Sequence, residues 1–176
     1  ALQGIAALER VYELFDTPNK IKDGSFNFEK KEKALGNLNF SNVDFLYPDG
    51  YQALHNINLN IEAGKSYAFV GRSGAGKSTI FNLLPRLFDS SKGTISLDGR
   101  SLLDNKISSL RDQISVVSQD SILLSGTVLD NIGFGKEGAS REDCITAAQD
   151  AAADKFITNL KDGYDTKIDP SKIKFS

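Results

Sequence analysis

The sequence contains only one cysteine, no excess of basic charge and no long apolar run. Because Cys144 is alone, no disulfide can form within the chain, which is typical of proteins from a reducing compartment. Its polar, helical surroundings predict a structural thiol. The net charge of −2 argues against a nucleic-acid-binding surface. No segment reaches the roughly 20 apolar residues of a membrane span, and no charged leader precedes a short apolar stretch, so we expect a soluble chain.

What the chain does contain is the composition of a globular protein, with 40% hydrophobic and 25% charged residues among 176. Residues 1–18 place apolar side chains at helical spacing up to Pro18 and predict an amphipathic helix. Ala1 opens this helix without a capping residue, which favours an origin inside a longer helix over a processed start. Residues 19–37 are polar and lysine-rich, and predict a solvated connector without a core of its own.

From Leu38 onward, short strand-like runs alternate with helical patterns. Strands are predicted over residues 40–47, 54–61, 66–70, 94–97 and 114–118, with a turn at Asp98-Gly99. Helices are predicted over residues 76–88 and 153–161, and Ser140 with Asp143 forms a capping-box pattern that opens another helix. This alternation predicts an α/β fold with one core.

A glycine-rich loop follows the predicted strand 66–70 and fits the pattern G-x-x-x-x-G-K-[ST]. Its residues are Gly71, Arg72, Ser73, Gly74, Ala75, Gly76, Lys77, Ser78 and Thr79. Glycines let backbone N–H groups approach an anion closely, and the helix that begins near Gly76 adds its positive N-terminal dipole. The pattern therefore predicts a P-loop that binds the phosphates of ATP.

The side chains of the loop suggest how the ligand is held. Lys77 supplies a flexible cation for the outer phosphates, Ser78 offers a hydroxyl to Mg²⁺, and Thr79 can donate to an inner phosphate. ATP and Mg²⁺ are therefore the expected ligands.

A P-loop alone does not identify the reaction, so two rival interpretations stay open. In a small kinase, the run Ile95-Ser96-Leu97-Asp98 would be an internal Walker B strand with Asp98 on magnesium, although Asp98-Gly99 is simpler as a hairpin turn. Alternatively, the chain is a module that binds ATP without hydrolysis, for structure or assembly only.

Two further segments resemble the ATP-binding domain of ABC transporters. Val43-Asp44-Phe45-Leu46-Tyr47-Pro48 looks like the family's aromatic loop, and Val116-Val117-Ser118-Gln119-Asp120 is similar to its Q-loop. The resemblance implies that Tyr47 stacks on adenine and that Gln119 reaches the magnesium, together with Ser78, and the attacking water. The alternative from the residues alone is that Tyr47 is an ordinary core aromatic at a strand end.

The resemblance covers residues 38–176 and implies a P-loop NTPase core with an N-terminal antiparallel β layer and a partial helical subdomain. Leu123, Thr127 and Asn131 resemble the exporter subgroup, so residues 1–18 would end a membrane-domain helix and residues 19–37 would link it to the ATP-binding part. The implied partners are the transmembrane domain of the same parent chain and a second ATP-binding domain. The implied location is the cytoplasmic side of a membrane.

The last residues resemble the approach to the family's L-S-G-G-Q signature, with Phe175-Ser176 as its first two residues. The family's Walker B aspartate, catalytic glutamate and switch histidine would lie further on, and His55, upstream of the P-loop, is expected to be an exposed turn or strand residue. We therefore expect MgATP binding without meaningful turnover, and an exposed apolar edge where the Walker B strand would pair. Residues 169–172 depart from the family's cross-talk segment, so coupling through them is uncertain.

Overall fold

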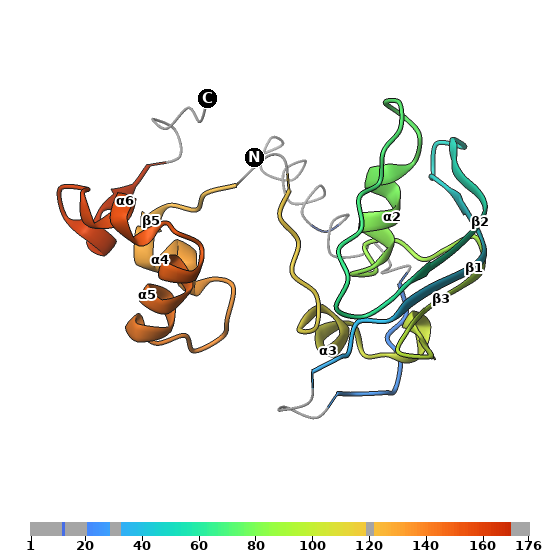
Figure 1. Cartoon of the computed structure of the whole chain (residues 1–176), viewed down its shortest axis with the longest axis horizontal. Coiled ribbons are helices and arrows are strands. Elements are labelled where there is room, and N and C mark those ends of the chain that lie inside the picture. The colour runs from blue at the N-terminus through green and yellow to red at the C-terminus, as the bar shows by residue number, and fades with distance from the viewer. Residues whose placement is uncertain (1–11, 13–20, 29–32, 119–121, 170–176) are drawn as a thin grey trace. The chain divides into compact units, whose positions relative to one another are not determined.

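The computed structural model describes Tyr12 and residues 21–28, 33–118 and 122–169, which divide into two compact units, 1–116 and 117–176. Each unit is described by itself (Figure 1). Apart from Tyr12, which is helical and exposed, the predicted helix 1–18 lies outside the described residues. No described helix is long and apolar enough to cross a membrane.

The first unit is built on an antiparallel sheet with strand order β2-β1-β3-β4. Its strands are β1 (Leu38–Leu46), β2 (Gln52–Ile61), β3 (Lys92–Leu97) and β4 (Arg100–Ser101). The predicted antiparallel layer is therefore confirmed. The turn at Asp98-Gly99 joins β3 to β4, as the hairpin interpretation requires. His55 lies on β2 with its side chain exposed, also as predicted.

A bulge in β1 explains how its apolar residues share one face. Phe40, Val43 and Phe45 are all buried, although the spacing from 40 to 43 breaks the alternation of a regular strand. The register shifts between Phe40 and Val43, and Asn42 has a φ of 49°. An extra residue in this left-handed conformation, which asparagine tolerates better than most, returns Val43 to the core face.

Helix α2 (Lys77–Leu83) lies against this sheet (Figure 1) and buries Ile80 and Leu83 in its core. The prediction that this helix continues to Phe88 is wrong. Leu84, the C-cap, still has helical geometry, but Pro85 has no backbone N–H to continue the helical hydrogen bonds, and Arg86 then has a φ of 51°, so the chain turns away.

Two predicted strands, over residues 66–70 and 114–118, are also wrong: both segments lack strand pairing in the structure. Among the described residues no strand lies beside either segment to complete a hydrogen-bonded ladder. Val70 is 91% exposed and Val117 is 96% exposed. Apolar side chains are therefore exposed in these two segments, as expected for strands without a partner. Phe69 still packs on the core, with its ring edge-on to Phe81.

The predicted connector, residues 21–28 and 33–37, is only partly solvated, because exposed residues are interspersed with half-buried ones. The N–H groups of Gly24 and Phe26 donate to the carbonyls of Asn105 and Asp104, respectively. The Phe26 carbonyl accepts a hydrogen bond from the N–H of Lys106. A Cβ on Gly24 would lie within 2.6 Å of the backbone of residues 104 and 105, so the two segments are in close contact. Residues 24–28 therefore lie against η1 (Leu102–Asp104) and the start of α3 (Ile107–Arg111), while Lys33, Leu35 and Asn37 stay exposed.

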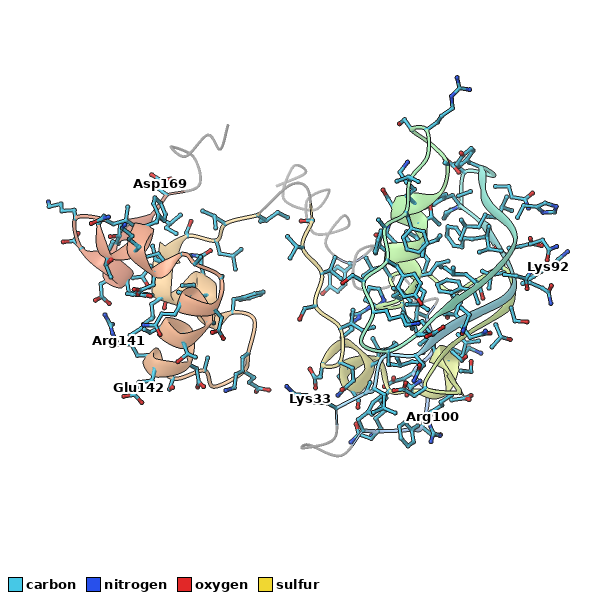
Figure 2. All side chains as sticks on the ribbon, viewed as in Figure 1. Lys33, Lys92, Arg100, Arg141, Glu142 and Asp169 are labelled. Carbon is cyan, nitrogen blue, oxygen red and sulfur yellow. The ribbon has the colours of Figure 1, made fainter. Side chains whose placement is uncertain are left out.

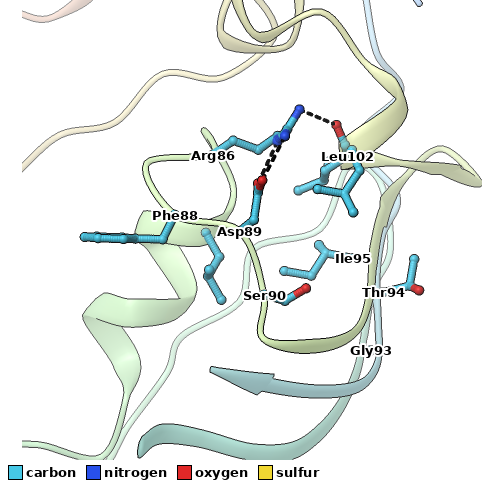
Figure 3. A pocket seen from close by; sticks show the side chains of 10 residues that line it. Arg86, Phe88, Asp89, Ser90, Gly93, Thr94, Ile95 and Leu102 are labelled. Carbon is cyan, nitrogen blue, oxygen red and sulfur yellow. Dashed lines mark hydrogen bonds and ion pairs between the residues drawn. The ribbon is translucent and has the colours of Figure 1, made fainter. Parts of the chain in front are cut away.

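Arg86 connects this connector to the end of α2. Its side chain is 2% exposed and makes two hydrogen bonds to the Asp89 carboxylate, 2.8 and 3.0 Å long. It also donates to the carbonyls of Lys22, Leu102 and Asn105. Figure 3 shows the bonds to Asp89 and Leu102 beside a small pocket. A buried cation is tolerated here because every side of the guanidinium meets an oxygen.

The second unit consists of short helices around a small core of Ala148, Ile157 and Tyr164. Its elements are β5 (Gly126–Thr127), α4 (Val128–Gly133), α5 (Arg141–Asp150), α6 (Asp154–Thr158), η2 (Gly163–Asp165) and β6 (Lys167–Ile168). The predicted capping box at Ser140 is confirmed, while the helix predicted over residues 153–161 is shorter. Cys144 is buried on α5. Burial, and then the hydrogen bond to Asp154, raise the pKa of Tyr164 to about 12.

Candidate functional site

The glycine-rich loop, residues 71–76, leads directly into α2. Residues 71–75 are exposed, whereas Gly76 is buried at the N-cap position with a φ of 82°. A Cβ on Gly76 would lie 2.6 Å from the carbonyl oxygen of Ala53 and 2.6 Å from the Leu54 side chain. Only glycine satisfies both the left-handed backbone and this contact with β2. The sequence pattern therefore has a structural reason at this position.

The N-terminus of α2 has free hydrogen-bonding capacity. The helix begins at Lys77, and no side chain caps it. The N–H groups of the first helical turn have no acceptor within the helix, and the helix dipole gives this end a partial positive charge. Ser78 is exposed in the same turn. Backbone donors, a hydroxyl and positive potential together fit a phosphate ligand with an associated Mg²⁺.

The Lys77 side chain folds back over the loop. Its ammonium nitrogen donates to the carbonyl oxygens of Gly71, at 2.8 Å, and Arg72, at 2.7 Å. The loop is closed further by a 3.2 Å hydrogen bond from Ala75 N–H to the Arg72 carbonyl. The ammonium thus lies over the same loop whose N–H groups would meet an anion.

Tyr47 contacts both the core and the P-loop. Its hydroxyl lies 3.0 Å from the Thr79 hydroxyl, and Thr79 is buried on α2. Its ring is edge-on to Phe45 and to Phe88, at centroid distances of 4.7 and 5.5 Å. The structure therefore brings Tyr47 to the P-loop side chains while it also packs as a core aromatic. Stacking on adenine stays a prediction.

One aromatic near the loop was missed by the sequence reasoning. Tyr51 follows the turn after Tyr47, and its hydroxyl donates to the Gly74 carbonyl at 3.1 Å. The signal was available, because a tight turn between Tyr47 and Tyr51 brings the two residues side by side. Of the other predicted site residues, Arg72 and Ser73 are exposed on the loop, whereas Gln119 lies outside the described residues.

Asp98 is occupied by the connector. Its carboxylate accepts hydrogen bonds from the backbone N–H groups of Leu35, Gly36 and Asn37, at 2.7 to 3.1 Å. Asp98 itself lies in the β3–β4 turn with a φ of 50°. A carboxylate committed to three backbone donors is a structural anchor, so the geometry gives no support to the kinase interpretation in which Asp98 holds magnesium.

Comparison of the sequence with known proteins identifies the family of this chain. Residues 54–176 match the family model described as "ABC transporter". The chain is 41% identical over 168 residues to an uncharacterized ABC transporter ATP-binding protein, YknV, of Bacillus subtilis, covering 96% of this chain and 28% of YknV. It is 44% identical over 174 residues to an ATP-dependent lipid A-core flippase of Legionella pneumophila, covering 99% of this chain and 29% of the flippase.

A solved structure agrees with both matches. A bacterial Atm1-family ABC exporter with ATP bound superimposes with a TM-score of 0.80 at 37% sequence identity, over 96% of this chain and 30% of the exporter chain. This likeness confirms the predicted P-loop NTPase fold class. The chain thus spans about 30% of the length of the relatives that it matches. It belongs to the ABC transporter family.

Proposed function

We propose that this chain binds MgATP on residues 71–79 and supplies the ATP-binding part of an exporter that couples ATP binding and hydrolysis to transport across a membrane. The observation that carries the proposal is the convergence on one loop of the Lys77 ammonium and the uncapped N-terminus of α2. Both favour an anion of high charge.

Each residue of the loop has a role in this proposal. The backbone N–H groups of the loop and of the first turn of α2 cradle the phosphates. Lys77 exchanges its two carbonyl acceptors for phosphate oxygens, and Ser78 and Gln119 hold Mg²⁺, which neutralises phosphate charge when bound. Thr79 donates to an inner phosphate and Tyr47, next to Thr79, covers the base.

The parent protein is proposed to be a transport ATPase. We propose that these residues alone bind MgATP without appreciable hydrolysis, since the resemblance implies that the family's catalytic glutamate and switch histidine lie outside them. The proposed partners are a transmembrane domain of the same parent chain and a second ATP-binding domain, at the cytoplasmic side of a membrane. No transported molecule is proposed for this chain, because the lipid A-core belongs to the names of several relatives.

A thermal-shift titration with MgATP tests the binding step. Ligand at about 100 times its dissociation constant stabilises a folded protein by roughly 2.7 kcal/mol. We expect this shift in the wild type, its loss in Lys77→Ala, and its retention in Lys92→Ala. Lys92 is a matched control because it is an exposed lysine on β3 (Figure 2), away from the loop. A shift that survives in Lys77→Ala would refute the assignment of the loop.

A further inference from the structure

Tyr51 is fixed against the P-loop although half of its surface is exposed. Its hydroxyl donates to the Gly74 carbonyl oxygen at 3.1 Å, across 23 residues of sequence. The phenol is thus a polar contact between the β1–β2 turn and the exposed part of the loop.

The turn that carries Tyr51 is itself held by short hydrogen bonds. The N–H of Tyr47 donates to the Tyr51 carbonyl at 2.9 Å, and the N–H of Tyr51 donates to the Asp49 carboxylate at 3.0 Å. The rings of Tyr47 and Tyr51 lie at 19° to each other, with centroids 6.3 Å apart. Because backbone and ring are both constrained, the Tyr51 hydroxyl has a defined position.

Gly74 is the point of the loop that most needs such a contact. Its φ of 80° is left-handed, and glycine has the widest choice of backbone conformations. In a trans peptide the carbonyl and the following N–H point in opposite directions, so a fixed Gly74 carbonyl also fixes the Ala75 N–H. That N–H donates to Arg72 and closes the loop. Tyr51 therefore constrains the loop conformation from outside the glycine-rich motif.

We propose that Tyr51 is a positioning residue of the nucleotide site, which sets the Gly74 peptide of the P-loop through its hydroxyl. The same turn carries Tyr47, so one short segment orients both the phosphate loop and the aromatic residue beside it. This inference rests on the proposed function, since the loop is taken to bind MgATP. Tyr51 lies outside the G-x-x-x-x-G-K-[ST] pattern.

The test compares two ligands and two phenylalanine variants of the full 176-residue chain. Dissociation constants are measured for MgATP and for magnesium tripolyphosphate, which has the phosphates but no base. Tyr51→Phe keeps the ring and removes the hydroxyl. Tyr67→Phe is the matched control, because the Tyr67 hydroxyl also makes one hydrogen bond to backbone, accepting from Glu62 N–H at 3.0 Å, in the same unit.

We expect Tyr51→Phe to raise both dissociation constants by the same factor, about 2- to 10-fold, the range for loss of one hydrogen bond. Tyr67→Phe should change neither, and both variants should unfold near the wild-type temperature when no ligand is added. A role that is merely structural would instead lower the ligand-free unfolding temperature.

Other outcomes overturn the inference. Equal binding by the wild type and Tyr51→Phe would show that the hydroxyl does not set the loop. Weaker binding of MgATP alone, with tripolyphosphate unchanged, would assign the hydroxyl to the base and not to Gly74. Equal losses in both variants would indicate a general effect of removing a phenol. If the wild type binds neither ligand, the proposed function itself fails, which is a distinct result.

Discussion

At the residue scale, the contacts that the sequence did not predict are hydrogen bonds between polar side chains and backbone groups of distant segments. Arg86 and Asp98 occur in segments that resemble ordinary loops and turns, yet each makes at least three hydrogen bonds to distant parts of the chain. The three backbone carbonyls that accept from Arg86 lie 16 to 64 residues away in the sequence. Because such contacts depend on which loops meet in three dimensions, no local pattern predicts them.

Arg86→Met should be strongly destabilising. The substitution keeps the approximate length but leaves the Asp89 carboxylate and three backbone carbonyls without their donor. Breaking a buried ion pair costs about 3 to 5 kcal/mol, and we expect the lower end because Asp89 is 30% exposed. Urea unfolding measures the change.

Lys92→Met is the control for this substitution, because it removes the same charge from an exposed position on β3 (Figure 2). It should change the free energy of unfolding by no more than about 0.5 kcal/mol. Equal stability of the two variants would show that the Arg86 hydrogen bonds do not hold the first unit together.

At the element scale, the sequence predicted an element correctly where neighbouring residues alone specify it. The capping box at Ser140, the hairpin turn at Asp98-Gly99 and the P-loop before α2 are specified by a few neighbouring residues, and all three form. The strands predicted over residues 66–70 and 114–118 have suitable residues but no neighbouring strand among those described. A strand requires a partner, whereas a cap requires only its own turn.

The capping box of α5 predicts a pH dependence. The Asp143 carboxylate accepts from Ser140 N–H at 2.9 Å and from Lys136 at 3.0 Å, and these bonds, the first above all, lower its pKa from 3.8 to about 2. Since the folded pKa lies below the unfolded value, the stabilisation is complete above about pH 5 and is lost as the pH falls from there through 2.

Thermal unfolding of the wild type and Asp143→Asn between pH 7 and pH 2 measures this effect. The difference between their midpoints should be constant above about pH 5, shrink from pH 4 downward and be smallest near pH 2. Glu142→Gln is the matched control, because it removes an equal charge from the same turn (Figure 2) without removing the Ser140 bonds. A difference that does not change with pH would contradict the role of the Asp143 charge.

At the scale of the whole molecule, the sequence predicted the fold class and the family, because these depend on a contiguous pattern, whereas phosphate binding by residues 71–79 stays a prediction. It did not predict that residues 21–28 are bound to η1 and α3, since their contacts are made by backbone groups that any residue carries. Nor did it single out Tyr51, whose contact with Gly74 exists only when the β1–β2 turn meets the loop. Gln119 remains a prediction from resemblance alone.

The central claim is that MgATP binds on residues 71–79, and amide hydrogen exchange with and without MgATP tests it most directly. The account predicts slower exchange over residues 72–79 in the wild type, with no such protection in Lys77→Ala and with β1 as an internal reference that changes less. Binding of MgATP to the folded wild type without protection of this loop, or with protection only in the second unit, would contradict it.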